Sequence, residues 1–168
     1  DDELRAMWAQ FKPDVRILVL SDSCHSGSVV KAMPSNPMLA SAMLPHYGVP
    51  RAMPSRVALA DYHAREALYR SIKRNTPRPR DVDIGASVIL ISGCQDSQVA
   101  MDGINNGVFT EQVLKVWNNG LWGSGTKTAY GLGAFHAEIV RRMPTSQVPN
   151  FFRVGKPDLE WELKPPFT

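Results

Sequence analysis

Residues 15–27 read Val-Arg-Ile-Leu-Val-Leu-Ser-Asp-Ser-Cys-His-Ser-Gly. The apolar run from Ile17 to Leu20 is typical of a buried strand, and it ends in small and polar residues around Cys24. Open α/β sheets place their ligand chemistry just beyond the carboxyl ends of parallel strands. A thiol at this position is therefore a candidate nucleophile, although a cysteine after a strand is more often buried and inert.

Strand and helix patterns alternate along the rest of the chain. Further strands are expected at 87–91, as a second buried run, and at 151–154, as an edge strand behind Pro149. Helices are expected at 2–11, 59–74, 108–118 and 129–143. This alternation predicts an α/β fold with a mainly parallel sheet covered by helices on both faces.

The helical patterns also predict which side chains point inward. In the first helix these are Leu4, Met7, Trp8 and Phe11, and in the second they are Leu59, Ala60, Ala64, Ala67, Leu68 and Ile72. The third and fourth helices would bury Phe109, Val113, Val116 and Trp117, and Tyr130, Phe135, Ile139, Val140 and Met143. Residues 28–56 show no period and are expected to form a long loop.

Composition bounds the class of protein. The 168 residues suit one domain, and 43% apolar residues are typical of a globular chain. No apolar run is long enough for a membrane span, and the first residues given lack the apolar h-region of a secretory signal. Two cysteines favour a reducing compartment, so we expect a cytoplasmic protein. Because the chain begins with Asp1 rather than Met, we expect a fragment or a processed product.

The net charge of +3 is unevenly distributed. Residues 28–80 carry nine basic and two acidic side chains. A basic segment of this kind could bind nucleic acid, but neither a regular interleaving of aromatic with basic residues nor a known nucleic-acid motif supports this interpretation. We therefore favour a solvated surface segment over a nucleic-acid partner.

Four segments together carry a resemblance to a known family. They are Asp22-Ser-Cys-His-Ser-Gly27, Ile91-Ser-Gly-Cys-Gln-Asp-Ser-Gln-Val-Ala-Met-Asp-Gly103, Asn106-Gly-Val-Phe-Thr110, and the C-terminal residues 142–155 with Pro165-Pro-Phe-Thr168. In order and spacing they resemble caspase-like cysteine peptidases, above all metacaspases and bacterial caspase-family proteins. The likeness runs from about residue 15 to the end and is weakest over 28–80.

The resemblance implies a caspase–haemoglobinase-like three-layer α/β/α sandwich with its N-terminal strands missing. Residues 1–168 would form a partial peptidase domain. Its parts would be a helix, strand and nucleophile turn at 1–27, a basic loop and helix at 28–80, and a part resembling a caspase small subunit at 81–168.

Three residues of the segment 22–27 have expected roles. Cys24 matches the family's nucleophile, whose backbone N–H could donate to an oxyanion. Asp22 matches the acidic residue that lines the S1 pocket of metacaspases and selects Arg or Lys; the alternative is a turn-capping aspartate. Gly27 would let a substrate carbonyl approach closely. The implied reaction is hydrolysis of a peptide or protein substrate, with no cofactor.

The catalytic histidine of such a peptidase is not expected in this chain. In caspases it lies roughly 50 residues before the cysteine, which falls upstream of Asp1, so an upstream segment of the same polypeptide would supply it. His25 adjoins Cys24, and its side chain should diverge from the thiol. His46 and His63 are expected to be solvated, and His136 to be a packing or surface residue on a helix.

Metal chemistry has little support in the sequence. Many metacaspases bind calcium through an aspartate seven residues after the nucleophile, where this chain has Lys31. Lysine cannot replace an oxygen ligand, so the calcium site is doubtful. Cys94 is interpreted as a small buried side chain rather than a metal or disulfide partner. Asp96 and Asp102 could shape a substrate cleft or cap the following helix.

Two functions from different classes remain. The first is a cysteine endopeptidase domain that attacks peptide bonds after Arg or Lys through the Cys24 thiolate. The second is an inactive caspase-like scaffold or protein-interaction module. The complete Asp22-Ser-Cys-His-Ser-Gly27 motif favours the first.

Overall fold

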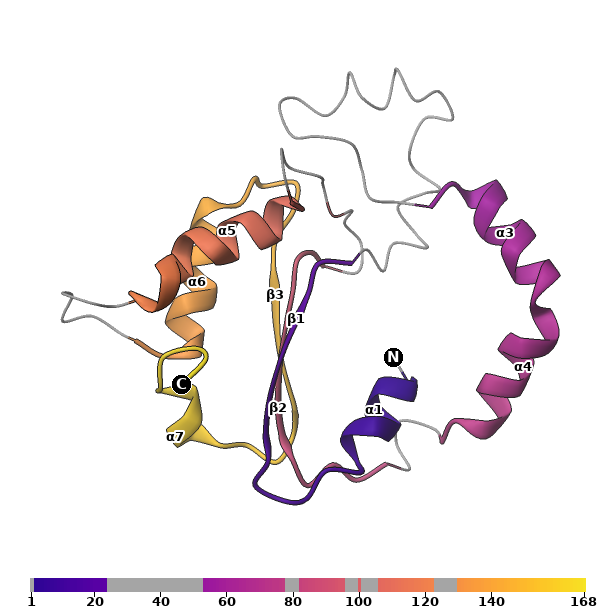
Figure 1. Ribbon diagram of the computed structural model, residues 1–168, viewed down its shortest axis with the longest axis horizontal. Helices are drawn as coiled ribbons and strands as arrows, with labels where there is room; N and C mark the ends of the chain where they lie inside the picture. The colour runs from indigo at the N-terminus through magenta and orange to yellow at the C-terminus, as the bar shows by residue number, and fades with distance from the viewer. Residues whose placement is uncertain (1, 24–52, 78–81, 96–99, 101–105, 123–129) are drawn as a thin grey trace. The chain divides into compact units, whose positions relative to one another are not determined.

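The computed structural model describes residues 2–23, 53–77, 82–95, 100, 106–122 and 130–168. The elements in chain order are α1 (Asp2–Trp8), β1 (Arg16–Ser21), α3 (Ser55–Ala64), α4 (Glu66–Asn75), β2 (Ser87–Ser92), α5 (Val108–Trp117), the 3₁₀ helix η3 (Asn118–Gly120), α6 (Leu132–Arg142), β3 (Asn150–Gly155) and α7 (Leu159–Glu162) (Figure 1). The chain is therefore mixed α/β, and all three strands and the helices α5 and α6 lie where the sequence pattern predicts them.

The three strands form one sheet in the order β1-β2-β3. At one end of the first pair Ser87 N donates to Val15 O at 2.8 Å, and at the other Gly93 N donates to Ser21 O at 2.7 Å. The constant offset between these partners means that β1 and β2 run parallel. Asp22 and Ser23, which follow β1, therefore leave the sheet at the same end as the residues that follow β2.

The strand β3 runs antiparallel to β2. Lys156 N, just after β3, donates to Ala86 O, just before β2, at 3.0 Å. At the other end, Gln147, just before β3, reaches Gly93 O, just after β2. The expected mainly parallel sheet is thus correct for the first pair only. An antiparallel edge strand on a parallel sheet is a common arrangement.

Burial separates the central strand from its neighbours. β2 is almost wholly buried, with Val88, Ile89 and Ile91 in the core. β1 is only half-buried, and Leu20 is 37% exposed. The expectation of a buried strand here was wrong in degree, because β1 has a strand neighbour on one side only in the part of the sheet that the structure describes.

The chain divides into two compact units. The first comprises 1–18, 53–89 and 153–157, and the second 19–52, 90–152 and 158–168. In the second unit α5 and α6 pack against each other (Figure 1). Both helices bury apolar faces, namely Val108, Phe109, Val113 and Val116 of α5 and Leu132, Phe135 and Ile139 of α6. Of the side chains predicted to point inward, Phe109, Val113, Val116, Phe135 and Ile139 are buried. Trp117, Val140 and Met143 are half-buried, and Tyr130 is exposed.

In the first unit the predicted helix 59–74 is two helices, because Arg65 leaves the helical conformation at φ −120° and ψ 20°. The side chains expected to point inward do not do so. Leu59 is 59% exposed, Leu68 is 54% exposed, and α4 contains no buried residue. Tyr62 and Tyr69 instead stack on each other at 5.7 Å. The hydrogen bond from Tyr69 to Asp61 raises the pKa of that tyrosine.

The first helix shows the same limit. α1 ends at Trp8, and only Trp8 of its predicted apolar face is buried. Leu4 and Met7 are exposed, and Phe11 lies beyond the helix and is exposed too. A seven-residue helix has too little length to bury a face that extends over a further turn.

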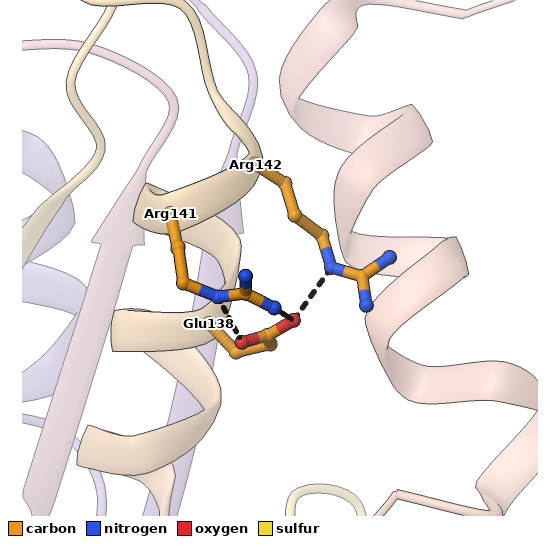
Figure 2. A network of polar contacts seen from close by, with 3 residues as sticks. All are labelled: Glu138, Arg141 and Arg142. Carbon is orange, nitrogen blue, oxygen red and sulfur yellow. Dashed lines mark hydrogen bonds and ion pairs between the residues drawn. The ribbon is translucent and has the colours of Figure 1, made fainter.

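A cluster of ion pairs lies in the last turns of α6. The carboxylate of Glu138 accepts from Arg141 Nη2 and Arg142 Nε, each at 2.7 Å (Figure 2). These hydrogen bonds lower the pKa of Glu138 to about 2. Both arginines lie in the last turn, where positive charge also interacts favourably with the helix dipole.

Candidate functional site

The segment that follows β1 is held by the segment that follows β2. Gly93 N donates a hydrogen bond to Ser21 O at 2.7 Å. The Cys94 thiol donates to Ser23 O, with 3.9 Å between Sγ and the oxygen. The side chains of Ser21 and Ser23 share a hydrogen bond of 2.8 Å. Residues 21–23 therefore have a defined path up to the residue before Cys24. Cys24 and Gly27 lie outside the described residues.

Asp22, the candidate S1 residue, is positioned by α5. Thr110 Oγ1 in the first turn of that helix donates to Asp22 Oδ2 at 2.6 Å. The contact joins residues 88 positions apart in the sequence. A hydroxyl bond to an ionised carboxylate at this distance is short and strong. Asp22 directly follows the parallel strand β1, and its carboxylate is held there by Thr110.

The residues after β2 form a buried support. Gln147 is fully buried and donates from Nε2 to Gly93 O at 2.9 Å. Ser92 Oγ donates to Cys94 O at 3.1 Å. Cys94 is 2% exposed, which confirms its interpretation as a small buried side chain. Its thiol also contacts the nucleophile segment, a role that sequence reasoning missed.

Close packing at Gly93 brings α5 to this edge of the sheet. A Cβ on Gly93 would lie 2.9 Å from the Cβ of Phe109, the residue before Thr110. No larger side chain fits there without a shift of Phe109. The glycine therefore permits the approach that places the Thr110 hydroxyl at Asp22.

Sequence reasoning did not single out Thr110, Gly93 or Gln147. Each lies within a segment that carried the family resemblance, so a signal was present, but no local pattern says which distant residue a hydroxyl or amide will reach. Asp96 and Asp102, which were considered for the cleft, lie outside the described residues.

The two described histidines have other surroundings. His136 Nε2 lies 3.1 Å from Pro149 O, and its ring centroid is 5.4 Å from that of Phe151. His63 is exposed beside Tyr62. The expected packing role of His136 and the solvation of His63 are confirmed. His25 and His46 lie outside the described residues.

The first unit contains a cavity of about 410 Å³. It is lined by Arg5, Val82, Asp83, Ile84, Gly85, Gly155 and Lys156. Lys156 there pairs with Asp14 at 3.2 Å. None of the residues assigned to the candidate site lines this cavity.

In the described part of the chain, no three His, Cys, Asp or Glu side chains come together as a group that could hold a metal ion. Lys31 lies outside that part. Among the described helices, none has the length and apolar character needed to cross a bilayer.

One comparison with known proteins identifies a family. A model of the caspase domain matches residues 1–156. The chain is similar to the crystal structure of protein GSU0716 from Geobacter sulfurreducens, with a TM-score of 0.80 and 46% sequence identity. The similarity covers 100% of this chain and 57% of that protein, so the chain spans little more than half its length. Among curated proteins, no match was found.

Proposed function

Because this chain belongs to the caspase-domain family, we propose that it is the nucleophile-bearing part of a cysteine endopeptidase that cuts after Arg or Lys. The observation that carries the proposal is the carboxylate of Asp22, fixed by Thr110 at the end of a parallel strand and two residues before Cys24. A fixed anion beside the nucleophile suits a substrate with a cationic side chain before the cut bond.

The proposed reaction proceeds through the Cys24 thiolate. The sulfur attacks the carbonyl carbon of the peptide bond, and the backbone N–H of Cys24 donates to the oxyanion that forms. The C–N bond then breaks, and the departing amine takes a proton from the protonated base. Water hydrolyses the resulting thioester, which releases the acid and regenerates the thiol. No metal or cofactor takes part, and Lys31 does not fit the calcium ligand found at that position in many metacaspases.

The base in this proposal is a histidine from a segment upstream of Asp1. The surroundings of the described histidines support this placement, since His136 contacts Pro149 O and His63 is solvated beside Tyr62. We place the domain in the cytoplasm, and we extend its fold to the three-layer sandwich of the family.

The test is peptide cleavage by the full-length protein. We expect peptides with Arg or Lys before the cut bond to be cleaved, and those with Gln or Met in that position to be cleaved far more slowly. Cys24→Ala should lower the rate at least about a thousand-fold, since the covalent route is lost. Thr76→Val changes a residue at the end of α4 that the candidate site does not include; it is the control and should retain the activity.

Two outcomes would contradict the proposal. Cleavage that persists in Cys24→Ala would exclude this nucleophile. If the wild-type protein cleaves none of the peptides, the inactive scaffold becomes the better account, and the exposed apolar side chains of α3 and α4 would then be the first place to seek a protein partner.

A further inference from the structure

Thr110 and Asp22 form a charge-assisted pair across 88 residues of sequence. The hydroxyl donates to Oδ2 at 2.6 Å, and both residues are half-buried. Partial burial reduces competition from water, so the hydrogen bond restricts the carboxylate more than a fully exposed one would. One carboxylate oxygen of Asp22 is thus held by a side chain of α5.

The donor stands on a rigid element. Thr110 lies in the first turn of α5, a ten-residue helix anchored by Val108, Phe109, Val113 and Val116. Phe109 packs tightly against Gly93, and Gly93 in turn binds Ser21, the residue before Asp22. The hydroxyl and the carboxylate are therefore fixed to the same framework, with little freedom between them.

From this geometry we propose that Thr110 is a positioning residue that restricts the rotation of the Asp22 carboxylate, the group that would bind the basic side chain of a substrate. The inference rests on the proposed function, which makes Asp22 the S1 residue. The terminal torsion of an aspartate has a broad energy minimum. Loss of the Thr110 hydroxyl removes one contact that orders the carboxylate, so substrate binding would have to supply more of that ordering, which weakens binding.

The expected effect falls on binding rather than on the chemical step, because Thr110 acts through Asp22. In the full-length protein, Thr110→Val removes the hydroxyl at nearly constant shape, and Thr110→Ser retains it. For Arg- and Lys-terminated peptides we expect KM to rise roughly ten-fold in Thr110→Val, as for a lost bond to a charged group, while kcat changes by less than about two-fold. Thr110→Ser should restore KM to near the wild-type value.

A double-mutant cycle separates this role from a merely structural one. If Thr110 acts through Asp22, Thr110→Val should change KM little once Asp22→Asn is present. Melting temperatures of all variants identify loss of folding, and Thr110→Ala gives a second hydroxyl-free variant if valine does not fit. Thr76→Val removes a hydroxyl that binds a backbone carbonyl at the end of α4 and serves as the matched control.

Three results would overturn the inference. KM could stay unchanged in both hydroxyl-free variants, the ten-fold effect could persist in full with Asp22→Asn, or serine could fail to restore binding. If the wild type cleaves after Arg and Lys while Thr110→Val binds normally, the inference alone is wrong. If the wild type shows no more cleavage than Cys24→Ala, the proposed function fails and this inference fails with it.

Discussion

Gly93 connects three parts of the second unit. Its N–H binds Ser21, its carbonyl accepts from Gln147, and its missing side chain admits Phe109 of α5. All three contacts are within the framework that holds Asp22. A change at this single residue should therefore disturb both stability and the candidate site.

We predict that Gly93→Ala destabilises the protein by about 1–3 kcal/mol, the usual cost of overpacking a core. The added methyl group would meet the Phe109 ring and displace the start of α5. Gly133→Ala is the matched control, because this glycine is exposed within α6 and a Cβ there meets no atom within 4 Å. The control should gain about 0.5–1 kcal/mol from helix propensity.

Urea unfolding of the two variants checks this prediction. Equal effects at the two positions would mean that the Gly93–Phe109 contact does not constrain the chain.

At the residue scale, sequence reasoning placed Asp22 correctly at the end of a strand, because apolar runs and their polar ends are local patterns. It could not find Thr110. A threonine in the first turn of a helix is also a common helix-start residue, and its true partner lies 88 positions away. Only the packing of α5 against the β2 end, permitted by Gly93, brings the two together.

The elements show a related limit. The sequence predicted the three described strands and the helices α5 and α6, but it merged α3 and α4 into one helix at 59–74 and overestimated its burial. Periodicity shows which side chains share a face; it does not show whether another element covers that face. Leu59 and Leu68 share the expected pattern with Phe135 and Ile139 of α6, yet only the latter pair meets a packed partner.

The ion-pair cluster of α6 gives a pH prediction. The pKa of Glu138 is about 2 in the folded chain, below its ordinary value of 4.5. Ionised Glu138 therefore stabilises the fold fully above about pH 4.5. Its contribution declines as the pH falls, because the unfolded chain takes up the proton first, and it is lost below about pH 2.

Glu138→Gln should lower the free energy of unfolding by about 1 kcal/mol at pH 7. The difference from wild type should shrink steadily between about pH 4.5 and pH 2. Glu111→Gln, which removes the single ion pair with Lys115, is the control and should cost less. The measurement is denaturant unfolding at several pH values, and a difference that does not depend on pH would contradict the assignment.

At the scale of the whole molecule, the buried side chains of the sheet are concentrated in β2. Each strand contributes residues to both compact units, and the central strand has the most complete burial. In the first unit, the helix α4 has no buried side chain. Local unfolding of such a helix breaks few packing contacts and costs little free energy, whereas local unfolding of a buried strand breaks many contacts and costs more.

We therefore predict that backbone amides of β2 exchange most slowly with deuterated solvent, and that those of α4 exchange rapidly. α5 is the matched comparison, because it has the same length as α4 but buries four side chains. It should show intermediate or strong protection. Exchange followed by mass spectrometry of peptides would decide the order, and equal protection of α4 and α5 would show that another surface covers α4.

The burial of Cys94 beneath Ser23 has one further consequence. The chain has two cysteines, so Cys24→Ala leaves Cys94 as the sole thiol. A maleimide can reach that sulfur only when the packing around Cys94, which includes its contact with Ser23 O, opens locally. The labelling rate of this variant would therefore measure local opening at the end of β2, without any substrate.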